Sequence, residues 1–270
     1  MTGGVLFAGV AVRFALRVWL VAMTASIDVA SVFSIALNNP AEYGRELHEI
    51  APLIDGFGGM FLFIVALFFF IDTRRRHLWV KSFETILVSI ATIAFIRPLI
   101  IAALFIIVEC IIPHEIRYVV GVSMLAGIAT YMLIHAIMLI MERMREKNTL
   151  KKQVGWTAFI SFMYLQVLDA SFSLDGVVGA FALTNNIVII TAGLGVGALW
   201  VRTMTVYMVR HNTLVKYKYL ESGAHWAIIS LAIIMFLKLL GMELPEIIIG
   251  TIGLVFIVGS VVSSTKVVKT

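Results

Sequence analysis

Charged residues are scarce in this chain of 270 residues. Asp, Glu, Lys and Arg together make up 14% of it, whereas a soluble domain carries about 25%. A deficit of this size argues against a water-soluble core. Because 61% of the residues are hydrophobic, the composition instead fits a chain whose main solvent is lipid.

Several other features are missing, and each absence removes a class of protein. Cys110 is the only cysteine, which excludes an intrachain disulfide and a cysteine-rich metal site. The first basic residue, Arg13, lies inside the first apolar run, so the N-terminus does not resemble a cleaved signal peptide. We find no HExxH motif and no nucleophile–base arrangement, and we therefore expect no enzyme. The net charge of +5 comes from short basic clusters between apolar runs, so we expect no nucleic-acid partner.

Long apolar runs dominate what is present. They cover approximately residues 5–36, 56–72, 86–112, 118–142, 155–184, 187–209, 224–241 and 245–262. A membrane span needs about 20 residues, so we predict an all-α, polytopic transmembrane bundle of about eight spans. It forms a single membrane domain, 1–270, in which a cytoplasmic linker, 143–154, joins a first half, 1–142, to a related second half, 155–270.

Basic residues alternate strictly between the predicted loops. The loops 73–85, 143–154 and 210–223 and the C-terminal tail hold four, five, three and two Lys or Arg, respectively. The intervening loops hold only Arg45 and Arg117. This is a positive-inside pattern. It predicts that both termini lie in the cytoplasm.

Two acids, Asp169 and Asp175, lie inside one apolar run. A charge at mid-membrane costs about 2.5–3.5 kcal/mol, so these residues need a partner or a polar cavity. Six residues at about 100° each separate the carboxylates by about 120° on a regular helix, so a shared site requires a broken helix. With Ser171 and Ser173 between them, a break would gather oxygens that suit a hard divalent cation such as Mn²⁺, Mg²⁺ or Ca²⁺. The alternative is structural ion pairing.

Other polar residues could complete such a site. Thr184 and Asn185 follow at the outer end of the same run, where they form either a simple turn or part of the cation route. Asp28 precedes a pair of asparagines at the spacing that follows Asp175, which indicates either a faint internal repeat or chance.

Arginines inside the apolar runs are the candidate counter-charges. Arg97 lies near the middle of its run, so pairing with an acid is expected there. Arg13 and Arg202 are further candidates, although Arg202 is close enough to a helix end to extend towards the interface. His135 is expected to be a hydrogen-bonded core histidine rather than a metal ligand.

The second half resembles the TerC superfamily. The matching stretch is Val167-Leu-Asp-Ala-Ser-Phe-Ser-Leu-Asp-Gly-Val-Val-Gly-Ala-Phe-Ala-Leu-Thr-Asn-Asn186, in which Asp169 and Asp175 correspond to the two acids of the superfamily's second acidic motif. Arg202 in Leu199-Trp-Val-Arg202 corresponds to its Leu-Arg. Tyr217-Lys-Tyr-Leu220 resembles a further element.

The first half resembles a bacterial branch of that superfamily that is named only as a domain of unknown function. The resemblance rests on Asn38-Asn-Pro-Ala-Glu-Tyr43 and Gly56-Phe-Gly-Gly-Met-Phe-Leu62, and Arg13 falls where the branch has an arginine. The superfamily's first acidic motif, Ser-Phe-Asp-Asn or Ser-Val-Asp-Asn, does not precede Met1. Either Asp28 replaces that motif, or the start differs, or half of the site is missing.

The resemblance implies export of manganese or a similar divalent cation and a link to tellurite resistance. The expected partners are the lipid bilayer and the transported ion, with no tightly bound cofactor, and either a second copy of the chain or membrane stress-response proteins. The alternative function, favoured by the missing motif, is a non-transporting membrane scaffold or a component for insertion or stress response.

Overall fold

The computed structural model describes residues 49–72, 78–90, 93, 95–146, 217–242 and 244–268, together with scattered positions between 192 and 207. The chain divides into two compact units, one of Met1–Ile54 and Phe172–Lys216 and the other of Asp55–Ser171 and Tyr217–Thr270. Most of the described residues belong to the second unit, and the packing below is that of this unit.

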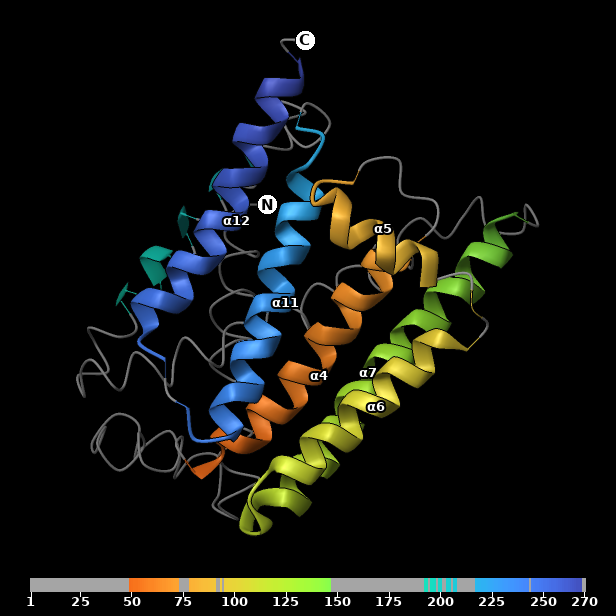
Figure 1. Ribbon diagram of the computed structural model, residues 1–270, viewed down its shortest axis with the longest axis vertical. Coiled ribbons are helices and arrows are strands. Elements are labelled where there is room, and N and C mark those ends of the chain that lie inside the picture. Colours follow the sequence, from red (N-terminus) through yellow and green to blue (C-terminus); the bar gives the residue numbers. More distant parts are fainter. Residues whose placement is uncertain are drawn as a thin grey trace. The chain divides into compact units, whose positions relative to one another are not determined.

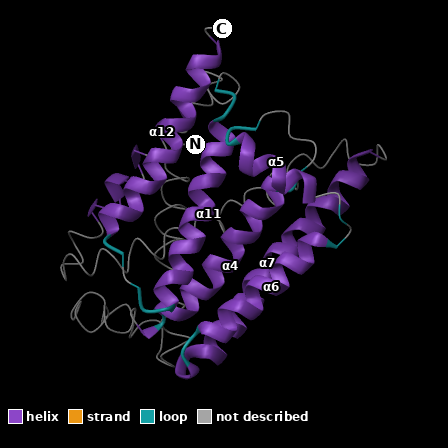
Figure 2. Cartoon of the chain, viewed as in Figure 1, coloured by secondary structure: helices purple, strands orange, loops and turns teal. Residues whose placement is uncertain are grey.

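Every regular element among the described residues is a helix (Figures 1 and 2). The helices with described bounds are α4 (Ala51–Phe70), α5 (Lys81–Ile90), α6 (Ile96–Ile111), α7 (His114–Glu146), α11 (Leu220–Leu239) and α12 (Glu246–Val268). Further helical residues lie between 192 and 207, inside the predicted run 187–209. The prediction of an all-α protein is confirmed for this part of the chain.

Helix α4 packs closely against α7. A Cβ atom on Gly127 of α7 would lie 2.6 Å from the carbonyl oxygen of Phe57, so only glycine permits the two backbones to approach this closely. Further along, the ring of Phe68 meets that of His135 at a centroid distance of 5.4 Å. Because both contacts advance in the same direction along the two helices, α4 and α7 run parallel.

Helix α11 runs antiparallel to α4. Gly59 of α4 faces the ring of Phe236, where an added Cβ would lie 3.2 Å from a ring carbon. Near the other end, Phe70 contacts Trp226, with ring centroids 5.0 Å apart. Since α4 lies between two helices, it contributes more buried apolar side chains than any other described helix, and Met60, Phe61, Leu62, Ile64 and Ala66 are fully buried.

Helix α12 returns antiparallel to α11 through a stripe of small residues. The backbone N–H of Tyr219, at the start of α11, donates to the Ser264 hydroxyl at 2.9 Å. One turn along, Gly223 faces Ser260, whose side chain occupies the place of a Cβ. Small residues are what allow helices to approach closely in a membrane protein.

The predicted run 86–112 is not one continuous helix. It is divided between α5 and α6, and Phe95, which precedes α6, has a φ of 66°. The reason is local, because Pro98 lacks an N–H and fits only the first turn of a helix. The run predicted as one span is therefore broken by a non-helical segment, and its second part, α6, has 16 residues.

Four described helices are long and apolar enough to cross a membrane. They are Ala51–Phe70, His114–Ile137, Leu220–Leu239 and Ile247–Lys266. Of the eight predicted spans, the runs 5–36 and 155–184 lie outside the described residues, and 187–209 is described only in part. Helix α7 continues past its apolar part to Glu146, so that it enters the predicted linker 143–154.

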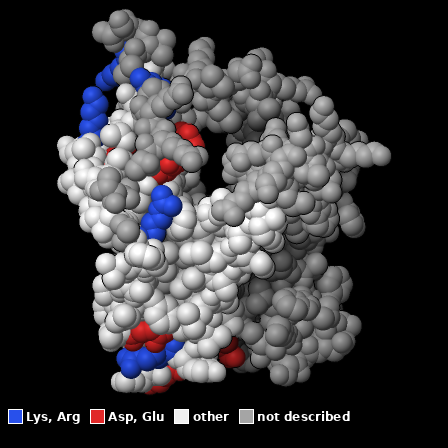
Figure 3. Space-filling view, turned by 90° about the vertical axis from the view of Figure 1, so that its right-hand side faces the viewer, with Lys and Arg blue, Asp and Glu red and all other residues white. Residues whose placement is uncertain are grey.

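The helix directions bring several termini to one end of this unit, which we call the basic end. It is formed by the ends of α4, α7 and α12 and by the starts of α5, α6 and α11, and it carries Lys81, Lys218 and Lys266. In Figure 3 one set of charged side chains lies at the bottom of the view and the others are spread over its upper half, with an uncharged band between the two sets. The predicted alternation of basic loops therefore corresponds to an alternation of helix ends in this unit.

Candidate functional site

Most of the predicted site lies outside the described residues. This holds for the candidate metal ligands and two of the counter-charges: Asp28, Asp169, Ser171, Ser173, Asp175, Thr184, Asn185, Arg13 and Arg202. The predicted gathering of these oxygens at one point therefore stays a prediction. Arg97 is the predicted site residue whose surroundings are described.

Arg97, in the first turn of α6, holds the end of α4. Its Nη2 donates to the carbonyl oxygen of Ile71 at 3.3 Å, and its guanidinium carbon lies 5.0 Å from the centre of the Phe68 ring. Carbonyl groups at the end of a helix have no partner within the helix and favour a cation, and the ring face adds a cation–π contact. The predicted pairing of Arg97 with an acid is not among these contacts and stays a prediction.

His135 belongs to the same aromatic set. Its ring stacks on Tyr131 at a centroid distance of 5.8 Å and meets the edge of Phe68 at 5.4 Å. The side chain is half-buried among these rings, and the predicted hydrogen bond stays a prediction.

Glu84 was missed by the sequence analysis and is the most deeply buried acid in the described part of the chain. Its side chain, 0% exposed, lies in the first turn of α5. The backbone N–H groups of Trp79 and Val80 donate to its carboxylate, each at 3.3 Å, and the indole Nε1 of Trp226 donates at 3.1 Å. The carboxylate thus satisfies N–H groups at the start of α5 and joins this helix to α11.

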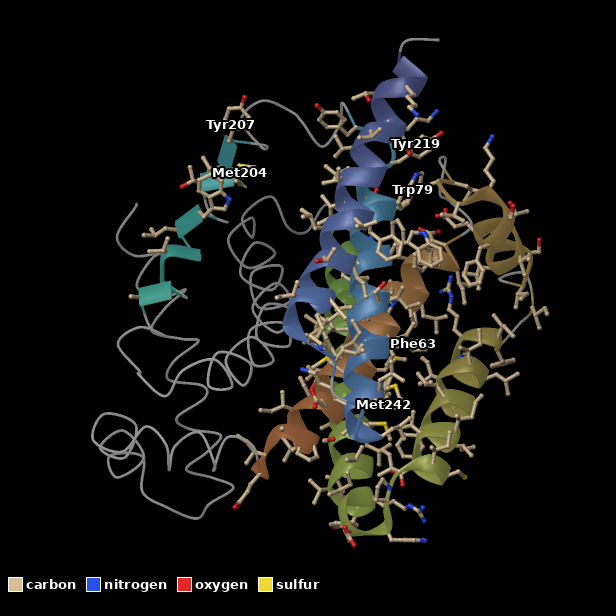
Figure 4. The ribbon with its side chains drawn as sticks, turned by 60° about the vertical axis from the view of Figure 1, so that its left-hand side comes forward. Phe63, Trp79, Met204, Tyr207, Tyr219 and Met242 are labelled. Carbon is tan, nitrogen blue, oxygen red and sulfur yellow. The ribbon has the colours of Figure 1, made fainter. Side chains whose placement is uncertain are left out.

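Aromatic rings surround the joint made by Glu84. Trp226 contacts Phe70 of α4, Phe83 of α5 and Phe256 of α12, with ring centroids 5.0, 5.3 and 5.9 Å apart. Trp79 meets Phe256 edge to face at 6.3 Å, and Figure 4 shows Trp79 close to Tyr219 at the same end of the bundle. Because these rings exclude water, the three hydrogen bonds to Glu84 form in an apolar environment, which strengthens them.

Asp55 is a second buried acid that the sequence analysis missed. It lies in the interval between the predicted runs 5–36 and 56–72, yet it belongs to α4 and is 7% exposed. Its neighbour Gly56 packs against Ser123 of α7, which is 4% exposed. The signal that could have found Asp55 is its position directly before the apolar run, since a helix begins before its apolar part.

Glu109 lies at the end of the unit opposite the basic end. Gly121 of α7 leaves the space that its carboxylate occupies. Within the described part of the chain, its Oε1 is buried without a hydrogen-bond partner, as is the Nε of Arg117. Arg117 closes the turn between α6 and α7 by donating from Nη2 to the Ile112 carbonyl at 3.0 Å. Glu109 was overlooked in the sequence because it lies inside the run 86–112 without a second acid nearby.

These acids are spread along the bundle rather than gathered. Among the described residues, no three His, Cys, Asp or Glu side chains come together in a way that could hold a metal ion. In chemical terms, the described unit is a scaffold in which charged groups join helices. The aspartates of run 155–184, on which the predicted cation site depends, lie outside the described residues.

Apolar helices that are long enough to cross a membrane, with charges at their ends, define a helical membrane protein. The chain belongs to the family described as "Protein of unknown function (DUF475)", whose model matches residues 1–270. No curated protein and no solved structure matches the chain. The expectation of a family of unknown function is thereby confirmed, while membership of a bacterial branch of the TerC superfamily stays a prediction.

Proposed function

We propose that the protein transports a divalent metal ion across the membrane, with manganese efflux as the first candidate activity. The observation that carries this proposal is the pair Asp169 and Asp175 within one apolar run. Two intramembrane carboxylates cost several kcal/mol unless they serve a cation or a counter-charge. A helical membrane protein provides the setting in which such a pair defines an ion pathway.

Each proposed ligand has a chemical role. Asp169 and Asp175 supply negative charge, and Ser171, Ser173 and Thr184 supply neutral oxygens, a set that suits a hard cation. Asn185 and Asp28 are further oxygen donors. Two close carboxylates do not both stay ionised once the metal ion has left, so uptake of a proton in exchange is part of the proposal.

The arginines balance the negative charge of the aspartates when no metal ion is bound. Arg202 is the first candidate because it corresponds to the Leu-Arg element of the TerC resemblance, and Arg13 is another. Arg97 is already held by the Ile71 carbonyl and the Phe68 ring, so its contribution would be a long-range field rather than a direct contact. The TerC resemblance supports this proposal and also relates it to tellurite resistance in the bacterial inner membrane.

The test is the substitution Asp175→Asn in a manganese-sensitive bacterial host. We expect cells with the wild-type chain to retain less ⁵⁴Mn than cells with the variant at equal expression. Glu115→Gln is a matched control, because Glu115 is an exposed acid at the α6–α7 turn and its loss should leave efflux unchanged. Equal retention in the wild type and Asp175→Asn would contradict the proposal and favour a non-transporting membrane role.

A binding measurement separates loss of transport from loss of the site. Mn²⁺ at about 100 times its dissociation constant should stabilise the purified protein by about 2.7 kcal/mol. We expect thermal unfolding to show this shift for the wild type and to lose it in Asp175→Asn, with Mg²⁺ and Ca²⁺ as comparison ions. No shift with any of these ions would argue against a resident cation site.

A further inference from the structure

Helix α5 is too short to cross a membrane and has three different faces. Its 10 residues span about 15 Å, half of the hydrocarbon core. At about 100° per residue, Lys81, Ser82, Thr85 and Ser89 form one strip, Phe83, Ile86, Leu87 and Ile90 form a second, and Glu84 lies on a third. Such a helix is built to meet three environments at once.

Contacts and exposure identify two of these environments. The strip with Glu84 faces the protein, because Glu84 is fully buried and bonds to Trp226 of α11. The polar strip is exposed at each of its four positions. The apolar strip is also open, with Phe83 47% and Ile86 59% exposed.

The segment after α5 extends the open apolar surface. Ile93 is 56% exposed and Phe95 is 85% exposed. Phe95 also holds a φ of 66°, a left-handed conformation that is costly for a bulky residue. Two apolar side chains as exposed as Ile93 and Phe95 fit an apolar environment outside the described unit rather than water.

The charges at this end indicate which apolar environment that is. Lys81 opens α5, and Lys218 and Lys266 lie at the same basic end; all three are exposed. The sequence adds Arg74, Arg75 and Arg76 between α4 and α5. The acids Asp72, Glu142, Glu146 and Glu221 at this end are fewer than these six cations. Exposed cations beside exposed apolar groups match the phosphates and acyl chains of phospholipids, and Trp79 and Tyr219 lie at the level where such rings favour the interface.

We propose that α5 is an interfacial helix that lies at the boundary of lipid and water. Phe83, Ile86 and Phe95 enter the acyl-chain region, and Lys81 lies among the phospholipid phosphates. Glu84 fixes the rotation of the helix by bonding to Trp226, so that the correct strip meets the lipid. The occupant of the open face is phospholipid, and neither a further protein helix nor a second copy of the chain is required.

The experiment compares neighbouring positions on α5 in the full chain. Cys110 is the only cysteine, so Cys110→Ser gives a background in which Ile86→Cys and Thr85→Cys each carry one nitroxide label. In vesicles of phosphatidylcholine and phosphatidylglycerol, the Ile86 position should be several-fold more accessible to oxygen than to the water-soluble relaxant NiEDDA. The Thr85 position should show the reverse preference.

Other outcomes would overturn the proposal. A label at the Ile86 position shielded from both reagents would mean that protein covers this strip. Preference for oxygen at both positions would indicate a membrane span, and preference for NiEDDA at both would indicate a helix in water. Phe83→Cys and Ser82→Cys repeat the comparison one turn earlier. All four positions are exposed, so the labels should leave folding intact, which gel filtration checks.

Discussion

At the scale of single residues, buried charge determines how this protein is joined together. Glu84 accepts three hydrogen bonds from two segments of the chain, and Arg97 holds the end of α4. Both residues satisfy backbone groups that a helix end leaves without partners. Removing either side chain leaves these backbone groups without a hydrogen-bond partner and lowers the stability of the fold. The position of the residue in the sequence does not reveal this effect.

We expect Glu84→Ala to lower the free energy of unfolding by about 2–4 kcal/mol. The change leaves three N–H donors without their acceptor in an apolar cluster, and hydrogen bonds to charged groups are worth about 1.5–3 kcal/mol each. Thermal unfolding of the purified protein in detergent measures the loss.

Thr85→Ala provides the control for this substitution. Thr85 is the next residue of α5 and is exposed, so its replacement should change stability by less than about 0.5 kcal/mol. Glu84→Gln keeps one acceptor oxygen, so its free energy of unfolding should lie between those of Glu84→Ala and Thr85→Ala. Equal stability of Glu84→Ala and Thr85→Ala would show that the buried carboxylate does not join α5 to α11.

At the scale of the helices, small residues determine which neighbours can approach. Gly127 and Gly223 each occupy a place where a side chain would meet the facing helix. Gly253 of α12 has nothing within 4 Å of a Cβ atom. Glycine is therefore needed for close helix packing at Gly127 and Gly223 but not at Gly253, and the sequence alone does not distinguish these positions.

We expect Gly223→Ala to destabilise the protein by about 1–3 kcal/mol, the usual cost of overpacking. Its Cβ would collide with Ser260 and lie 2.8 Å from the carbonyl oxygen of Phe256. The matched control is Gly253→Ala, which should be neutral or stabilising by up to about 1 kcal/mol because alanine favours a helix. Thermal unfolding of both variants checks the difference, and a similar shift for both would contradict close packing of α11 on α12.

Most of the described helices were predictable, because their apolar runs are long and end in polar loops. The runs 224–241 and 245–262 correspond closely to α11 and α12. The break between α5 and α6 was not found, because Ile93 and Phe95 are apolar and continue the run without a polar interruption. Pro98 was the available signal, since it requires a helix to begin shortly before it.

The residues of the candidate site were likewise predictable from the sequence only in part. The sequence identified Arg97 as an unusual charge within an apolar run, but its contacts with Ile71 and Phe68 depend on how α4 and α6 pack. Glu84 could not be recognised as buried, because it precedes the apolar part of its segment. Burial at a helix start follows from a distant partner, here Trp226, that local periodicity does not contain.

At the scale of the whole molecule, the alternation of basic ends predicts how the protein lies in the membrane. The positive-inside rule predicts that the basic end faces the cytoplasm. In the Cys110→Ser background, Lys266→Cys should react with an impermeant maleimide only after cells are opened. Glu115→Cys, at the α6–α7 turn, should react in intact spheroplasts. Reaction of both positions from the same side would contradict the arrangement.

The three consecutive phenylalanines at the end of α4 restrict how this helix can move. Phe68 contacts Arg97 of α6 and His135 of α7, while Phe69 stacks on His225 of α11 at 3.5 Å and Phe70 meets Trp226. Since these rings point in directions about 100° apart, α4 cannot turn about its own axis without breaking all of these contacts together. We therefore expect α4, α6, α7 and α11 to be displaced as one rigid body during any conformational cycle, so that the hinge lies at its boundary.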